Sequence, residues 1–142
     1  MNETEVLTLF SQGFDCSQIV LSEIRDELNL DDVTAKKVTA CFGGGMFCAE
    51  TCGAVTAALM AIGLKYGHYM PHATDDKNKA IKKSMEFKSK FLEKYPSLKC
   101  KEILGYDLSN PDEMEIITEK NLIPNICPKL VIDTIVALKN TL

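Results

Sequence analysis

The chain has 142 residues, of which 46% are hydrophobic and 25% are charged. This balance is typical of a globular protein and differs from that of a disordered chain. The formal net charge of −4 excludes the basic surface that a nucleic-acid groove requires. A chain of this length can bury a real core without disulfides, so we expect one helical domain over residues 1–142.

The first residues, MNETEVLTLFSQG, lack the basic start, apolar centre and small-residue cleavage site of a signal peptide. No apolar run reaches the roughly 18 residues that identify a membrane-spanning helix. We therefore expect a cytoplasmic protein with no membrane insertion. Thiols are kept reduced in that compartment, where several cysteines more often indicate metal or redox chemistry than structural disulfides. The six cysteines are thus the main clue to function.

Helical periodicity runs along the whole chain, and no strand pattern or internal repeat interrupts it. The sequence therefore predicts an all-α bundle of about six to seven helices. A short amphipathic helix over 3–12 ends at Gly13, and Asp15 is a good N-cap for the helix that follows. A third helix begins at Asp31-Asp32 and runs to about 40. Its inward residues are expected to be Val33 and Val38.

The stretch from 41 to 67 is the centre of the chain's organisation, because it holds three cysteines, a triple glycine and the longest uncharged run. Residues 54–64 predict a buried helix of about four turns. Three successive glycines carry too large an entropy cost for a helix interior, so they form a tight turn or approach a ligand or an anion. Small residues after Cys52 allow close helix packing or a nearby cofactor. The candidate cofactor-binding residues are Gly43, Gly44, Gly45 and Gly53.

The second half of the chain begins with a connector that holds both histidines, His68 and His72. Pro71 between them makes a shared helical face unfavourable, so solvent-facing histidines are preferred to a metal pair. A long helix over 74–95 follows, with a lysine-rich outer face. Its inward residues are expected to be Ile81, Met85, Leu92 and Tyr95, with Phe87 and Phe91 beside them.

The last part of the chain contains three more predicted helices. A short helix carries Cys100 and closes at Gly105, and a second starts at Asn110-Pro111 and runs to about 120. Residues 122–125 are expected to form a loop. Cys127-Pro128 then opens the final helix, because proline favours the first helical position.

Four cysteines fall at or near predicted helix starts: Cys16, Cys52, Cys100 and Cys127. Backbone N–H groups and the helix dipole lower the pKa of a thiol at such positions. If the four sulfurs converge, they form a multi-thiol site for dithiol/disulfide exchange. The same sulfurs are also suited to zinc or an iron–sulfur cluster, although the usual CxxC spacings are absent.

Cys48 and Cys52 are four residues apart, so on one helix they share a face. Two thiolates in that geometry suit one metal ion, and the candidate metal ligands are Cys48, Cys52, Cys100 and Cys127. Glu50 between them is a candidate proton acceptor, with an exposed helix glutamate as the commoner explanation.

The set of cysteines resembles the family named for its C_GCAxxG_C_C pattern, whose members are described as redox-active because of their cysteines. The matching residues are Phe14-Asp15-Cys16-Ser17-Gln18, Gly43-Gly44-Gly45-Met46, Cys52-Gly53-Ala54-Val55-Thr56-Ala57, Leu59-Met60-Ala61-Ile62-Gly63-Leu64, Cys100, Glu102-Ile103-Leu104-Gly105 and Cys127. The resemblance covers most of the chain and implies a shared set of four sulfurs at Cys16, Cys52, Cys100 and Cys127. Ala57 departs from the pattern, which has glycine there. Cys41 and Cys48 are additional, so the choice between Cys48/Cys52 and the shared four stays open.

Three hypotheses follow for the function. The first is a thiol-based redox protein, with thiol-disulfide oxidoreductase activity, in which Cys52 and another helix-start cysteine form a reversible disulfide with an unidentified redox partner. The second is a zinc or iron–sulfur protein that uses the same cysteines. The third is a helical interaction domain with inert buried cysteines. Homo-oligomer formation is left open.

Overall fold

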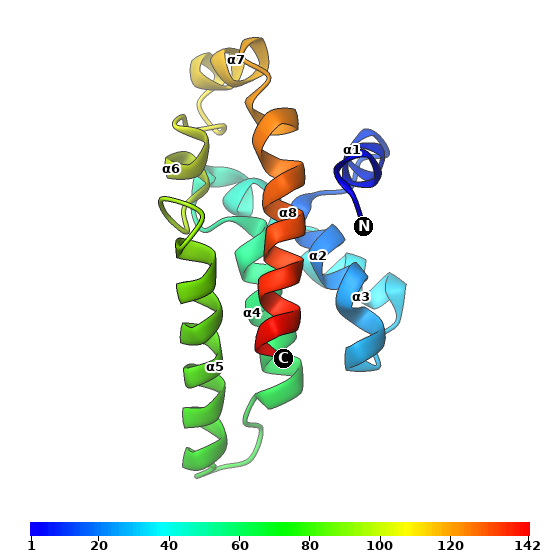
Figure 1. Cartoon of the computed structure of the whole chain (residues 1–142), viewed down its shortest axis with the longest axis vertical. Coiled ribbons are helices and arrows are strands. Elements are labelled where there is room, and N and C mark those ends of the chain that lie inside the picture. Colours follow the sequence, from blue (N-terminus) through cyan, green and yellow to red (C-terminus); the bar gives the residue numbers. More distant parts are fainter.

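The computed structural model describes all residues 1–142 and is entirely helical, with no β-sheet (Figure 1). The all-α prediction is confirmed. Seven of the eight α-helices have eight residues or more, in line with the expected number. The helices are α1 (Glu3–Ser11), α2 (Cys16–Ile24), α3 (Asp32–Thr39), α4 (Gly53–Tyr66), α5 (Thr74–Leu92), α6 (Cys100–Leu104), α7 (Pro111–Glu119) and α8 (Leu122–Thr141).

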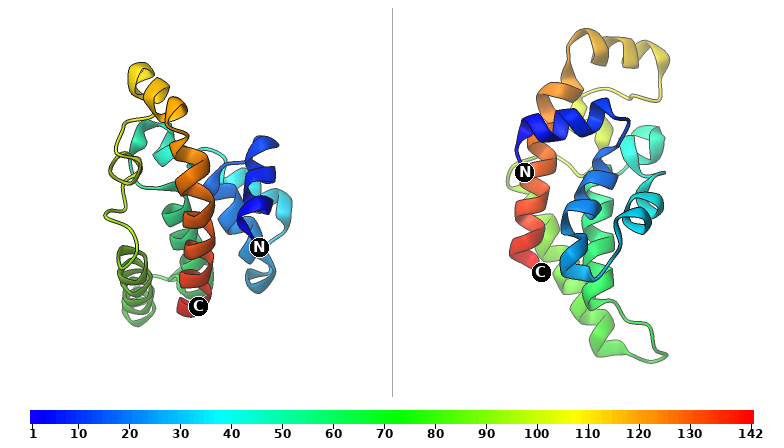
Figure 2. Two further views of the ribbon diagram at one scale, coloured as in Figure 1. Left: turned by 45° about the horizontal axis from the view of Figure 1, so that its top comes forward. Right: turned by 90° about the vertical axis from the view of Figure 1, so that its right-hand side faces the viewer.

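The predicted central helix is present as α4 and forms the middle of the core. It packs against α2, α5 and α8, and Figures 1 and 2 show α2 and α5 on opposite sides of it. A helix that is apolar on all sides is expected to be surrounded by others. Its small residues allow the neighbouring backbones to approach closely, because Ala54, Ala57, Ala58 and Ala61 are all fully buried.

Helices α6 and α7 extend the molecule beyond this core at the N-terminal end of α8 (Figure 1). Cys100, Leu104 and Ile117 form a second, smaller buried cluster there. Helices α7 and α8 meet at an angle of 81°. No single helix of the chain has both the length and the apolar composition needed to cross a membrane.

The predicted inward face of α3 is wrong. Val33 and Val38 are 61% and 51% exposed, whereas Ala35 and Thr39 are fully buried. Polar contacts with α2 set the rotation of the helix, because Asp32 accepts a hydrogen bond from Ser22 on α2. Residues 32, 35 and 39 lie on one helical face, so this contact turns both valines toward solvent.

The predicted inward face of α5 is also wrong in part. Ile81, Met85 and Leu92 are 46%, 62% and 46% exposed, while Phe87 and Phe91 are buried. Helix α5 lies at the edge of the bundle, so only one stripe of it meets α4 and α8 (Figure 1). The aromatic side chains occupy that stripe because they bury the largest apolar area.

The start of α8 lies earlier in the chain than predicted. The helix begins at Leu122, directly after Asn121, whose φ of 52° is left-handed. Pro124 falls in the first turn, where the missing N–H group has no partner inside the helix and costs no hydrogen bond. Residues 122–125 are therefore helical rather than a loop. Cys127 lies in the second turn of α8 and not at a helix N-terminus.

The triple glycine leads into a left-handed turn, in what we call the glycine loop (residues 43–50). The φ angles of Gly44, Gly45, Met46 and Phe47 are +58°, +61°, +61° and +54°. A Cβ atom on Gly45 would lie 2.5 Å from the backbone nitrogen of Glu50. The loop thus has the tight-turn form, and glycine at position 45 is required both by φ and by space.

This geometry predicts a large difference between two glycine-to-alanine substitutions. We expect Gly45→Ala to lower the free energy of unfolding by about 2–4 kcal/mol, because alanine is strained at positive φ and its Cβ meets rigid backbone. Gly63→Ala, inside α4 with no atom near its Cβ position, is expected to stabilise by about 0.5–1 kcal/mol. Urea unfolding of both variants checks this, and equal stability would contradict the described loop.

Candidate functional site

One cavity brings together the four cysteines that were predicted to converge. It has a volume of about 340 Å³, and its wall includes Cys16, Cys52, Cys100 and Cys127. The four sulfurs come from α2, the N-cap of α4, α6 and α8, although they are spread over more than a hundred residues of sequence. The volume lies near the lower end of the range for small-molecule sites.

A short pairing of extended backbone places Cys52 and Cys100. The N–H group of Cys52 donates to the carbonyl of Leu98 at 2.7 Å, and that of Cys100 donates to the carbonyl of Glu50 at 2.7 Å. These bonds flank an isolated antiparallel bridge between Thr51 and Lys99. Since side chains alternate along extended backbone, both cysteine side chains lie on the same side of this bridge.

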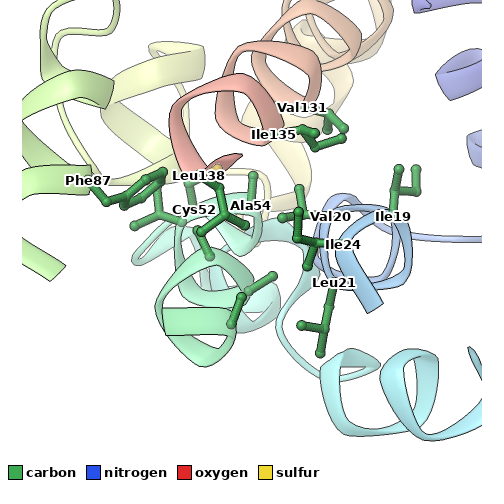
Figure 3. Close-up of a cluster of buried hydrophobic side chains, with 14 of the residues drawn as sticks. Ile19, Val20, Leu21, Ile24, Cys52, Ala54, Phe87, Val131, Ile135 and Leu138 are labelled. Atoms are coloured by element: carbon green, nitrogen blue, oxygen red, sulfur yellow. The ribbon is translucent and has the colours of Figure 1, made fainter. Parts of the chain in front are cut away.

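Gly53 allows Cys16 to approach Cys52. A Cβ atom on Gly53 would lie 2.9 Å from the sulfur of Cys16 and 2.5 Å from the carbonyl oxygen of Phe42. The absence of a side chain therefore serves close packing of the chain's own groups. Cys52 is only 7% exposed and belongs to the main core, near Phe87 (Figure 3), whereas Cys16 is partly exposed.

The thiols of Cys16 and Cys52 interact with each other, and their pKa values move in opposite directions. The interaction with the Cys52 thiol lowers the pKa of Cys16, and the N–H groups of Gly44 and Ser17 add to this effect against the cost of burial. The same interaction and burial raise the pKa of Cys52 well above that of a free thiol. The arrangement favours a thiolate at Cys16 and a thiol at Cys52.

Cys100 and Cys127 behave as buried neutral thiols. Burial, followed by the negative charge of Cys16, raises the pKa of each to about 12. The expectation that helix starts lower all four pKa values is therefore wrong for these two residues. Cys100 begins a helix of only five residues, whose dipole is small, and Cys127 is not at a helix start.

The structure does not place Cys48 with the other candidate metal ligands. Cys48 is exposed in the glycine loop, where its thiol contacts the carbonyl oxygen of Gly45 at 3.4 Å, and it is not part of the cavity wall. The left-handed turn separates it from α4, so Cys48 and Cys52 share no helical face. Cys41 is also exposed. No three Cys, His, Asp or Glu side chains are arranged as ligands of one metal ion.

The remaining predicted residues have mixed positions. Gly44, Gly45 and Gly53 line the cavity, but Gly43 does not. Glu50 is also outside the wall, and its carboxylate lies 3.8 Å from the ammonium group of Lys101. The structure therefore does not place Glu50 as a proton acceptor for the cavity thiols.

Apart from the cysteines and these three glycines, the wall residues were not predicted from the sequence. Most of these residues are apolar, and they include Phe10, Phe14, Phe47, Leu108 and Met114. Asp15 also lines the cavity, although only its capping role was predicted. Its position directly before Cys16 was the one signal that pointed to it.

Comparison with known proteins gives one match. The family model described as "Putative redox-active protein (C_GCAxxG_C_C)" matches residues 14–141. No curated protein and no solved structure matches the chain.

The different pKa values predict an order of alkylation by iodoacetamide. In a Cys41→Ser/Cys48→Ser background, Cys16 should react first. Its alkylation rate should reach half its maximum at a pH below the pKa of a free cysteine thiol, which is about 8.5. Cys100 and Cys127 should stay unmodified in the folded protein until the pH approaches their pKa of about 12. Peptide mapping by mass spectrometry gives the order, and early modification of Cys100 would contradict it.

Proposed function

The chain belongs to the C_GCAxxG_C_C family, and from this premise we propose that it is a thiol-based redox protein whose working pair is Cys16 and Cys52. The observation that supports the proposal is the placement of Cys16 beside Gly53, directly next to Cys52 in the wall of one cavity. The pKa is lowered at Cys16 and raised at Cys52. A thiolate and a neighbouring protonated thiol are what disulfide exchange requires. Cys16 is the more exposed of the two, so it takes the attacking role.

The exchange with an oxidised disulfide partner balances in two steps. The Cys16 thiolate attacks one partner sulfur, the partner S–S bond breaks, and one partner thiolate leaves from the mixed disulfide. Cys52 then loses its proton and attacks the sulfur of Cys16. This forms the Cys16–Cys52 disulfide and releases the second partner thiolate, which takes up the proton. Two electrons pass from the protein to the partner, and a dithiol reductant reverses the sequence.

The surroundings of Cys52 assist the second step. Cys52 is the N-cap residue of α4, and the N–H groups of Ala54 and Val55 in the first turn lower the pKa of its thiol. These amides oppose the effect of burial. They stabilise the negative charge that develops on Cys52 after Cys16 has formed the mixed disulfide and is no longer an anion.

The proposal predicts one specific disulfide. When the reduced Cys41→Ser/Cys48→Ser protein is treated with bis(2-hydroxyethyl) disulfide, we expect the loss of two free thiols and a Cys16–Cys52 cross-link in the peptide map. Cys52→Ser should stop at the mixed disulfide on Cys16, because the two thiols that remain in the wall, Cys100 and Cys127, stay protonated. Cys100→Ala is the matched control and should still form the cross-link.

Two results would overturn this assignment. One is an unchanged thiol count in the folded protein. The other is a set of Cys16→Ser and Cys52→Ser variants that differ from the parent in stability alone, which would return these cysteines to the role of packing residues.

A second candidate is an iron–sulfur or zinc centre, because four cysteines line the cavity while a dithiol needs only two. Four thiolates are the usual ligand set of iron–sulfur clusters and of structural zinc. The ligands would be Cys16, Cys52, Cys100 and Cys127, with Cys16 in place of the expected Cys48. A cluster bound there would carry single electrons. The raised pKa values of three of these thiols weigh against it, because binding must first remove their protons.

Metal analysis separates the two candidates. The dithiol proposal predicts substoichiometric iron and zinc, and no visible absorption band, in protein purified without oxygen. Stoichiometric metal that is lost in Cys100→Ala and in Cys127→Ala, but kept in Cys48→Ser, would instead support the four-sulfur centre.

A further inference from the structure

The cavity around the proposed dithiol has an unusual distribution of charge. Among its 17 wall residues there is no lysine, arginine or histidine, and Asp15 is the only charged side chain apart from the cysteines. Cys100 and Cys127 are neutral at ordinary pH. Any formal charge that a ligand meets in the wall is therefore negative, from Asp15 and from the Cys16 thiolate.

Asp15 is held in place at this wall. It is the N-cap of α2, and its N–H group donates to Oε1 of Gln18 at 3.0 Å. The glycine loop lies directly against it, since a Cβ atom on Gly43 would lie 2.5 Å from the Cβ of Asp15. The charge of Asp15 raises the pKa of Cys16, which is a second sign that it acts on the reacting sulfur.

Cations on the surrounding helices are paired elsewhere. Lys36 of α3 lies 5.2 Å from the centroid of the Phe14 ring, but its ammonium group donates to Asp32 at 2.6 Å. Lys101 of α6 pairs with the carboxylate of Glu50. Lys120, next to α7, donates to the hydroxyl of Tyr106 at 2.9 Å. None of these three cations lines the cavity, where it could balance an incoming anion.

The rest of the wall favours apolar groups. Phe10, Phe14, Leu108 and Met114 are half-buried around the cavity, and Phe47 is 53% exposed although it also lines the wall. A ligand with an apolar substituent would cover these side chains and remove their surface from water. The volume of about 340 Å³ suits a small molecule or a single side chain.

We propose that the substrate of the Cys16–Cys52 pair is an uncharged, apolar disulfide, and that Asp15 determines this specificity by repelling anionic disulfides. The inference rests on the proposed dithiol function. Carboxylate-bearing disulfides of the glutathione type would bring negative groups against Asp15 and the Cys16 thiolate in a cavity with a mostly apolar wall. A neutral alkyl or aryl disulfide avoids this repulsion and gains apolar contact.

Oxidation rates with a set of small disulfides test the proposal. Reduced Cys41→Ser/Cys48→Ser protein is mixed with dipropyl disulfide, bis(2-hydroxyethyl) disulfide, cystamine or 3,3′-dithiodipropionate, which differ in charge and polarity. Each rate is divided by that of the same disulfide with a neutral cysteine amide, which cancels differences in leaving group. We expect the normalised rate for dipropyl disulfide to exceed that for dithiodipropionate at least tenfold at low salt, which corresponds to about 1.4 kcal/mol. Added salt should narrow the gap.

Asp15→Asn tests the role of the carboxylate, because asparagine is an equally good N-cap and carries no charge. In this variant the normalised rate with dithiodipropionate should rise several-fold relative to that with dipropyl disulfide. Glu50→Gln removes a carboxylate outside the wall and is the matched control, for which no change in selectivity is expected.

The outcomes separate this inference from the function on which it rests. Equal normalised rates for neutral and anionic disulfides would overturn the substrate class, while a Cys16–Cys52 cross-link would still support the dithiol. Selectivity that persists unchanged in Asp15→Asn would overturn the role of Asp15. The absence of any cross-link with all four reagents would overturn the dithiol function itself. The measurements on the parent protein decide the substrate class even if Asp15→Asn fails to fold.

Discussion

The site depends on the close approach of the start of α4 to the start of α2. Gly53 makes this approach possible, because any side chain there would collide with the carbonyl oxygen of Phe42 and with the sulfur of Cys16. The contact places Cys16 beside Cys52, whose thiol lowers the pKa of Cys16. The packing of α4 against α8 then fixes the pair relative to Cys127, and the backbone bridge between Thr51 and Lys99 fixes it relative to Cys100.

Burial raises the pKa of every sulfur in the cavity, and opposing interactions with N–H groups occur only at Cys16 and Cys52, which distinguishes the four. Burial dominates at Cys100 and Cys127, which therefore stay protonated. At Cys16 the neighbouring thiol and two backbone N–H groups outweigh it. Four residues of one type thus acquire different chemistry without a single basic side chain in the wall. A thiolate stabilised by dipoles alone adds no positive charge to attract anions.

Much of this arrangement could be predicted from the sequence, and the failures have identifiable causes. Caps such as Asp31 and Asn110 located helix starts correctly, since their signals are local. The exposed face of α3 depended on the contact between Ser22 and Asp32. The start of α8 depended on the acceptance of Pro124 in the first helical turn. Hydrophobic periodicity encodes neither of these. The convergence of the four cysteines was a hypothesis from their positions at predicted helix starts, and the family resemblance implied the same four residues. The different pKa values of the four thiols could be assigned only from distances and burial in the structure. The sequence indicated Asp15 only as a helix cap, so its place in the cavity wall was not predicted.

The bridge between Thr51 and Lys99 has a mechanical consequence. Cys52 and Cys100 each follow a bridge residue directly, and each is fastened to the opposite segment by its own backbone N–H group. A shift of Cys52 toward Cys16 during bond formation would pull on the segment that holds Cys100. This segment follows α4 and α5 in the chain, whereas Cys52 precedes them. If the proposed disulfide forms, the two backbone hydrogen bonds give a direct main-chain route from the Cys16–Cys52 pair to Cys100, on the other side of the cavity.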